Sequence, residues 1–205
     1  MEKKVKYSFF HKNNKHELVQ DYFQLRTEVF REYWELDNFS GEEDEFDNDA
    51  HILVIHKNNV CVGGARLVLH LPGSSNLLPI ETDSFKMVRL FPDFNLETNI
   101  YSELSRVVLS KEYRTGEYSA FLYHMIGEKA RSLNVKYVFA CAPLCQARMS
   151  KIACRKVGIN LEIKSEIDVP ELPTYEGNKM YLSITDLTNT HSTKYQEHLQ
   201  IKDTV

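Results

Sequence analysis

The sequence predicts a single α/β domain built on one mixed, twisted sheet flanked by helices. Segments with apolar residues at helical spacing alternate with segments of β-branched residues at period two. A strand, a helix and a further strand follow one another after residue 100, an order that makes the two strands parallel. A hairpin precedes them, so the sheet is expected to combine antiparallel and parallel pairs.

Length and composition fit one globular domain over residues 1–205. Of its 205 residues, 42% are apolar and 11% aromatic, and the formal net charge is −4. Disordered chains have fewer aromatics, and proteins that coat nucleic acid are basic, so neither class is expected. No apolar run suits a signal peptide or reaches the ~20 residues of a membrane span. We therefore expect a soluble, cytoplasmic protein.

The first expected helix covers residues 16–35 and leads into an acidic loop, so that residues 1–50 form an N-terminal helix and loop. Arg26 lies in the middle of the helix's apolar arc. A buried guanidinium needs partners, although its stem can also pack while the head reaches solvent. Residues 41–49 hold six carboxylates. They supply such partners if the loop folds back, whereas a charge run alone is typical of a solvated loop.

Residues 51–56 and 60–70 show a strand pattern on either side of Asn58 and Asn59. This predicts a β-hairpin with positive φ in the turn. Both faces of the second strand are apolar, so it is expected in the interior of the sheet with Arg66 directed inward.

The remaining elements follow from the same patterns. After a proline-containing loop over residues 71–99 with one short helix, we expect strands at 100–110, 136–141, 159–163 and 179–184, helices at 116–132 and 144–157, and a frayed tail at 190–205. Glu103 and Arg106 lie three residues apart on one strand, so a regular strand points them to opposite faces, and a bulge changes that. The turn at 110–116 is typical of a βα connection and also of an anion site at a helix N-terminus.

The four cysteines lie in apolar strings such as Val-Phe-Ala-Cys-Ala-Pro-Leu-Cys. This favours reduced, buried thiols over disulfide bridges. Cys141 and Cys145 lack a second pair at zinc-finger spacing, so no metal site is expected.

Arginines and carboxylates balance one another in the first half of the chain. Bidentate pairs are available between Arg26, Arg66 or Arg106 and Asp44, Asp47 or Glu103. One interpretation is a structural ion-pair network that ties the first helix and its loop to the sheet. The other is a polar pocket that holds a charged substrate beside a general base. Residue spacing alone leaves both open.

Eight of these positions occur in one order: Arg26, Phe30 and Trp34 on the first helix, Asp44 and Asp47 in Glu-Glu-Asp-Glu-Phe-Asp, Arg66 in Ala-Arg-Leu, and Glu103 and Arg106 in Glu-Leu-Ser-Arg. This pattern resembles the acyl-homoserine-lactone synthases, relatives of the GNAT acyltransferases. The resemblance covers the first half of the chain densely and the second half in layout.

The resemblance implies a GNAT-like fold that passes an acyl group from acyl carrier protein or coenzyme A to the amine of S-adenosylmethionine. Lactone closure then releases methylthioadenosine, and the product serves quorum sensing. Both reactants are substrates, and no tightly bound cofactor is implied. Glu103 and Arg106 are then catalytic, with Glu103 as the general base. The implied substrate-binding residues are Arg26, Phe30, Trp34, Asp44, Asp47, Arg66 and Ser105.

The sequence also departs from that family. Val68 follows Arg66-Leu67 where the family often has a threonine that helps select the acyl chain, and Tyr101-Ser102 replace a common tryptophan. Long-chain N-acyl amino acid synthases are similar in Ala-Arg-Leu-Val and in Leu-Ser-Arg-Val-Val-Leu-Ser-Lys-Glu-Tyr-Arg, and they imply a free amino acid as acceptor. A third alternative is a catalytically silent domain that binds an acyl ligand or acyl carrier protein.

Residues 129–161 carry seven basic side chains and no acidic one. Arg148, Lys151 and Arg155 share one helix face, and Arg114 lies in the preceding basic turn. Such a stripe fits a strongly acidic partner, and the resemblance implies acyl carrier protein. The alternative is a solvated basic face, and nucleic acid is not expected because exposed aromatics are not interleaved.

Overall fold

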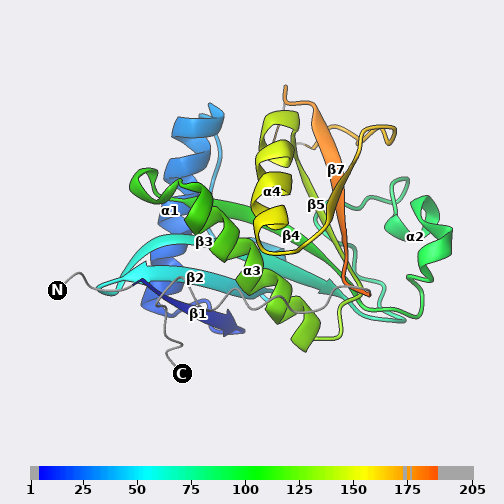
Figure 1. The fold of residues 1–205 in the computed structure, drawn as a ribbon, viewed down its shortest axis with the longest axis horizontal. Coiled ribbons are helices and arrows are strands. Elements are labelled where there is room, and N and C mark those ends of the chain that lie inside the picture. The colour runs from blue at the N-terminus through cyan, green and yellow to red at the C-terminus, as the bar shows by residue number, and fades with distance from the viewer. Residues whose placement is uncertain (1–4, 173–174, 176, 189–205) are drawn as a thin grey trace.

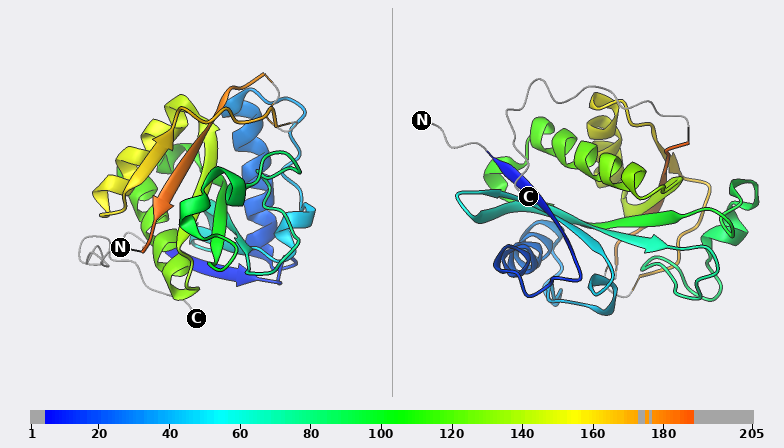
Figure 2. Two further views of the ribbon diagram at one scale, coloured as in Figure 1. Left: turned by 90° about the vertical axis from the view of Figure 1, so that its right-hand side faces the viewer. Right: turned by 90° about the horizontal axis from the view of Figure 1, so that it is seen from below.

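A computed structural model describes residues 5–172, 175 and 177–188 of the chain. One seven-stranded mixed sheet in the order β1-β2-β3-β4-β5-β7-β6 forms the centre of this part (Figure 1). Helix α1 covers one face of the sheet, and α3 and α4 cover the other, as Figure 2 shows. The expected α/β domain is thus confirmed, whereas the predicted frayed tail at 190–205 lies outside the described residues.

Most elements begin and end within two residues of their expected positions. The strands are β1 (Lys6–His11), β2 (His51–Lys57), β3 (Val60–His70), β4 (Tyr101–Leu109), β5 (Tyr137–Pro143), β6 (Leu161–Lys164) and β7 (Met180–Asp186). The longer helices are α1 (Glu17–Trp34), α3 (Gly116–Ser132) and α4 (Leu144–Lys156), and the short α2 is Met87–Leu90. Strand β1 was not expected, because at the sheet edge its side chains are mostly half-buried and show no clear alternation.

The hairpin of β2 and β3 has the expected turn, with φ values of 54° and 62° at Asn58 and Asn59. Strand β3 lies between β2 and β4, which confirms its interior position. The pairing of β3 with β4 shifts register between Gly64 and Arg66. Arg106, on the β4 side of this bulge, has a φ of 54°. Of the two alternatives that the sequence left open for Glu103 and Arg106, a regular strand or a bulged one, the structure has the bulge.

Strands β4 and β5 are parallel, as expected, but they pair only over residues 101–103 and 137–139. Strand β5 pairs with β7 along its whole length, and beyond Phe139 it no longer pairs with β4. Main-chain groups of β4 after this point therefore border open space on the β5 side. This divergence sets the position of the functional site.

Apolar side chains fill both faces of the sheet. Val19, Tyr22 and Phe30 on α1 belong to the cluster on one face, and Phe121 and Leu122 on α3 belong to the cluster on the other. Burial at ~25 cal/mol per Å² of apolar surface makes these two interfaces the main source of stability. Among the described helices, none combines the length and apolar character that crossing a bilayer requires.

The four cysteines are all free thiols, and Cys61 and Cys154 are buried. The expected burial is wrong for Cys145, which is exposed, and only partly right for Cys141. Cys145 lies in the first turn of α4.

Candidate active site

A cleft of about 930 Å³ opens where β4 and β5 diverge. The end of α1 and the loop that follows it form one wall, and β5 and α4 form the other. The predicted site residues that line the cleft are Phe30, Trp34, Asp44, Arg66, Glu103, Ser105 and Arg106. The fold therefore brings seven of the predicted site residues, from α1, the acidic loop, β3 and β4, together around one cavity.

Arg26 and Asp47 do not line the cleft but lie behind it. The Arg26 guanidinium donates to both carboxylate oxygens of Asp47, at 3.1 and 2.7 Å, and also to the carbonyls of Gly41 and Glu42. Only 1% of Arg26 is exposed, so the interpretation of a guanidinium that reaches solvent is wrong. Arg26 instead clamps the acidic loop onto α1.

Asp47 connects this clamp to the sheet. Its side chain is fully buried and accepts from Arg26 and, at 3.3 Å, from Arg66 on β3. It also accepts the main-chain N–H of Asp44 at 2.9 Å, which closes a capping box at the start of a single 3₁₀ turn. These bonds hold Asp44 at the edge of the cleft.

Asp44 faces the cleft, and 32% of its side chain is exposed. One oxygen accepts from Arg66 at 2.5 Å, and the other lies 3.6 Å from the Arg106 guanidinium. Burial by itself raises the pKa of Asp44, but the charges of Arg66, Arg106 and Arg26 outweigh burial and lower it. Asp44 is therefore a carboxylate at neutral pH. Arg66 is in turn fixed by a 3.1 Å bond to the Ser105 hydroxyl.

Glu103 is the buried acid of the cleft. One of its oxygens accepts the main-chain N–H of Ile80 at 2.7 Å. Burial raises the pKa of Glu103 to about 7, against the opposing effects of Arg66, the Ile80 N–H and Arg106. A carboxyl group with this pKa exchanges a proton readily near neutral pH, which is the property of a general base or acid.

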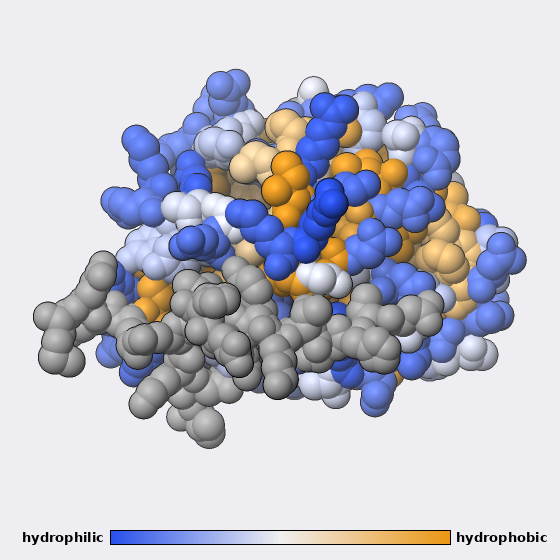
Figure 3. All heavy atoms as spheres, viewed as in Figure 1, coloured by the Kyte–Doolittle hydropathy of each residue, from blue (hydrophilic) through white to orange (hydrophobic). Residues whose placement is uncertain are grey.

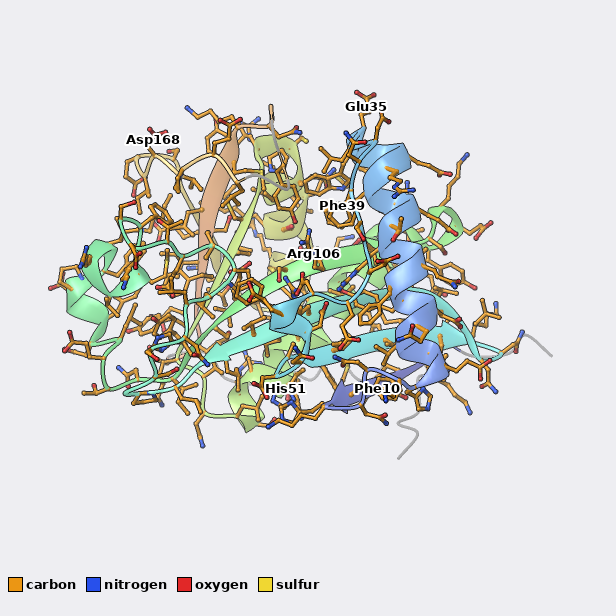
Figure 4. All side chains as sticks on the ribbon, turned by 180° about the vertical axis from the view of Figure 1, so that it is seen from behind. Phe10, Glu35, Phe39, His51, Arg106 and Asp168 are labelled. Carbon is orange, nitrogen blue, oxygen red and sulfur yellow. The ribbon has the colours of Figure 1, made fainter. Side chains whose placement is uncertain are left out.

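Arg106 extends from the bulge into the middle of the cleft, close to Phe39 (Figure 4). Its guanidinium carbon lies 4.8 Å from the centre of the Phe39 ring, and one of its nitrogens donates to the Tyr175 hydroxyl at 3.0 Å. Arg106 therefore ties β4 to the acidic loop through Asp44 and to the segment before β7 through Tyr175.

An aromatic wall stands beside these charges. Phe30 stacks on Trp34 at 5.0 Å and on Phe39 at 4.4 Å between ring centroids, and Tyr175 lies 5.9 Å from both Phe30 and Trp34. Tyr175 was missed as a site residue, because it comes from an irregular proline-containing segment without periodicity. Phe39, also missed as a site residue, is buried and packs the loop onto α1 through its stack on Phe30.

The described residues that line the cleft carry far more negative than positive charge. The acidic ones are Glu35, Asp37, Glu42, Glu43, Asp44, Glu45 and Glu103, and the basic ones are Arg66 and Arg106. A concave surface with an excess of carboxylates attracts cations and raises their local concentration. Within the described residues, no three His, Cys, Asp or Glu side chains converge as a metal-binding group would.

The remaining predicted residues lie outside the cleft. Arg148, Lys151 and Arg155 are exposed on α4, where Met149 and Ile152 between them are 55% and 62% exposed. Figure 3 shows hydrophobic atoms interleaved with hydrophilic side chains over this helix. Arg114 is also exposed, stacks on Tyr33 at 4.7 Å and donates to the Leu109 carbonyl.

Comparison with known proteins identifies the fold. The family described as an acetyltransferase (GNAT) domain matches residues 25–124. Among solved structures, the acyl-homoserine-lactone synthase BjaI, determined with SAM and isopentyl-CoA, is 17% identical with a TM-score of 0.61, over 90% of this chain and 84% of that one. The chain has the GNAT fold. The expected likeness to acyl-homoserine-lactone synthases is thus confirmed at the level of the fold.

Two further solved structures are similar over nearly the whole chain. The acyl-homoserine-lactone synthase LasI is 12% identical with a TM-score of 0.59, over 90% of this chain and 91% of that one. FeeM, an N-acyl amino acid synthase from uncultured soil microbes, is 11% identical with a TM-score of 0.55, over 91% and 93%. The search of curated protein sequences finds no match. The matched family and these neighbours support an acyltransferase.

Proposed function

We propose that this GNAT protein transfers an acyl group from a thioester to the amine of S-adenosylmethionine, and that the carboxylate then closes the lactone ring on the carbon bound to the sulfonium, which breaks the C–S bond, releases methylthioadenosine and gives an acyl-homoserine lactone for signalling. The choice of acceptor rests on the charge of the cleft, which is lined by seven acidic side chains and two arginines. S-adenosylmethionine carries a sulfonium and an ammonium group, whereas a free neutral amino acid has no net charge. An acidic cleft favours the cation.

The aromatic wall supports the same acceptor. Trp34 and Tyr175 offer π-faces to a purine ring and to a sulfonium centre, and Phe30, only 2% exposed and stacked on Trp34 and Phe39, supports them from behind. Asp44, kept ionised by the arginines that surround it, offers a carboxylate at the edge of the cleft to the acceptor's ammonium group.

Glu103 serves as the general base in this proposal. The acceptor nitrogen attacks only after the ammonium has lost a proton, which Glu103 takes directly or through one water. The nitrogen then forms a bond to the thioester carbon, and the tetrahedral intermediate expels the thiolate as the amide forms. In this proposal, main-chain N–H groups of Ser105–Val107, which line the cleft beyond the residues of β4 that pair with β5, hold the oxyanion.

The acyl donor in this proposal is a thioester of acyl carrier protein. Met149 and Ile152 form an exposed apolar pair among Arg148, Lys151 and Arg155 on the outer side of α4. Gln146 and Ser150 on the same helix line the cleft. An acidic carrier that docks on the outer face of α4 therefore starts within one helix width of the reaction centre.

The test is an assay of thiol release from acyl thioesters, with S-adenosylmethionine in one series and the twenty amino acids in the other. The proposal predicts release that depends on S-adenosylmethionine and is lost in Glu103→Gln while ligand binding persists. Release with a free amino acid alone moves the protein to N-acyl amino acid synthesis. Binding without release in both series, unchanged in Glu103→Gln, supports the silent binding domain.

A further inference from the structure

A second, small apolar cavity lies directly behind the cleft, between α3, α4 and the sheet. Its volume is about 20 Å³, room for about one water molecule. Leu104 on β4, Tyr123 on α3 and Ala140 on β5 line both the cleft and this inner cavity. The two spaces therefore share one wall, and Tyr123 is the largest side chain in it.

Tyr123 is held in this wall by a hydrogen bond between helices. Its hydroxyl lies 2.5 Å from the hydroxyl of Ser150 on α4, which also lines the cleft. The phenol thereby links α3 to α4 across the boundary of the two cavities. A tethered ring is a firmer barrier than a free one, because its rotation breaks this part-buried hydrogen bond.

The inner cavity suits an apolar chain once it is opened. Its lining includes Gly127, which has no side chain, the small side chain of Cys154, and the apolar side chains of Ile126 and Ile159. On the cleft side, Leu104, Val107 and Ala140 continue this apolar surface, away from the carboxylates of the acidic loop. The apolar path from the reaction centre thus ends at the Tyr123 ring.

We propose that Tyr123, tethered by Ser150, is the chain stop of the acyl site and sets the longest acyl group that the protein accepts. This inference rests on the proposed acyl transfer and adds a specificity-determining residue to it. An acyl chain that is too short to reach past the Tyr123 ring packs against that ring. A longer acyl chain must displace the ring or leave methylene groups in water. A misplaced methylene costs about 10–200-fold in kcat/KM.

The test measures kcat/KM and calorimetric binding for a series of saturated acyl pantetheine thioesters of increasing length. In the wild type, both are expected to fall by about tenfold beyond a limiting length. Tyr123→Ala joins the cavities and moves this limit to longer chains. Tyr123→Phe keeps the ring but removes its bond to Ser150, and it moves the limit by less than Tyr123→Ala does. Cys154→Met added to Tyr123→Ala refills the inner cavity and moves the limit back.

Ala140→Val narrows the same boundary and does not depend on the folding of Tyr123→Ala. It is expected to shorten the limit. A folded Tyr123→Ala with the wild-type length profile, or an Ala140→Val without a shift, overturns the chain stop. Binding profiles that shift as described in a protein that turns over no thioester retain the chain stop and reject the proposed reaction instead.

Discussion

Tyr22 on α1 donates a hydrogen bond of 2.8 Å from its hydroxyl to the main-chain carbonyl of Arg106 on β4. Arg106 has a φ of 54° at this point, a conformation that costs about 1–3 kcal/mol in a residue other than glycine. The Tyr22 ring reaches β4 across β3 because Gly64 has no side chain, since a Cβ there lies 2.6 Å from the ring. Tyr22 and Gly64 therefore hold the bulge that aims Arg106 into the cleft.

Tyr22→Phe removes this hydrogen bond and leaves the ring in place. We expect kcat to fall by about tenfold or more with little change in KM, because the bulge that positions Arg106 and the neighbouring N–H groups loosens. The free energy of unfolding should fall by about 1 kcal/mol. Tyr33→Phe, an exposed tyrosine on the same helix, is the matched control. A Tyr22→Phe variant with wild-type kcat shows that the bulge holds without the hydroxyl.

Asp47→Ala leaves the buried guanidinium groups of Arg26 and Arg66 without their shared carboxylate. We expect a loss of about 3–5 kcal/mol in the free energy of unfolding, measured by urea denaturation. Asp49→Ala, which removes an exposed partner of Lys12 in the same loop, should change stability by less than about 1 kcal/mol. Equal effects of the two substitutions contradict the clamp.

The activity of the proposed enzyme should rise with pH through about 7, because Glu103 accepts a proton only as a carboxylate and its pKa is raised to about 7. The profile of kcat/KM against pH, measured with a thioester of short chain length, reports this ionisation. Glu103→Gln should abolish that limb together with most of the turnover. A rising limb that persists in Glu103→Gln assigns the base to another group.

The same ionisation affects stability with a defined sign. The folded state holds the Glu103 proton more tightly than the unfolded chain, whose carboxyl group has the ordinary value of 4.5. The contribution of the Glu103 proton to the free energy of unfolding is fully present below about pH 4.5 and is lost as pH rises towards 7. Glu103→Gln should therefore gain stability relative to the wild type between these values. Urea denaturation at pH 4 and pH 8 checks this, and an unchanged difference contradicts a buried, protonated Glu103.

Charge reversal on α4 tests the carrier surface. Arg148→Glu with Lys151→Glu should lower kcat/KM for an acyl carrier protein thioester by about tenfold or more and weaken its dependence on salt. Turnover of the matching pantetheine thioester should not change, because both residues lie outside the cleft. Lys12→Glu with Lys15→Glu, exposed before α1, is the control. Equal losses with both donors contradict docking on α4.

The sequence predicted the inward arginines, because their placement is a local consequence of pattern, whereas it left the bulge on β4 open. Arg26 sits in an apolar helical arc, whereas the spacing of Glu103 and Arg106 showed only that a regular strand points them to opposite faces and that a bulge changes this. The pattern did not separate Asp44 from Asp47, since both belong to one charge run. The two differ only because the loop folds back onto the body of the protein, which buries Asp47 completely and leaves Asp44 at the edge of the cleft.

Features that depend on distant segments were beyond the sequence. Tyr175 reaches Arg106 from 69 positions away, and the Tyr123 and Ser150 hydroxyls meet only when α3 packs on α4. Strand β1 was missed because an edge strand is paired on one side and carries a weak pattern. These contacts depend on tertiary packing, which hydrophobic periodicity along the sequence does not predict.

The proposed acceptor and general base are tested most directly by mass spectrometry of the products that the purified protein forms from S-adenosylmethionine and acyl carrier protein thioesters. The account predicts an acyl-homoserine lactone and methylthioadenosine in equal amounts, and neither product with Glu103→Gln. Free fatty acid alone, or an acylated amine formed equally well by Glu103→Gln, contradicts the assignment of the acceptor and of the base.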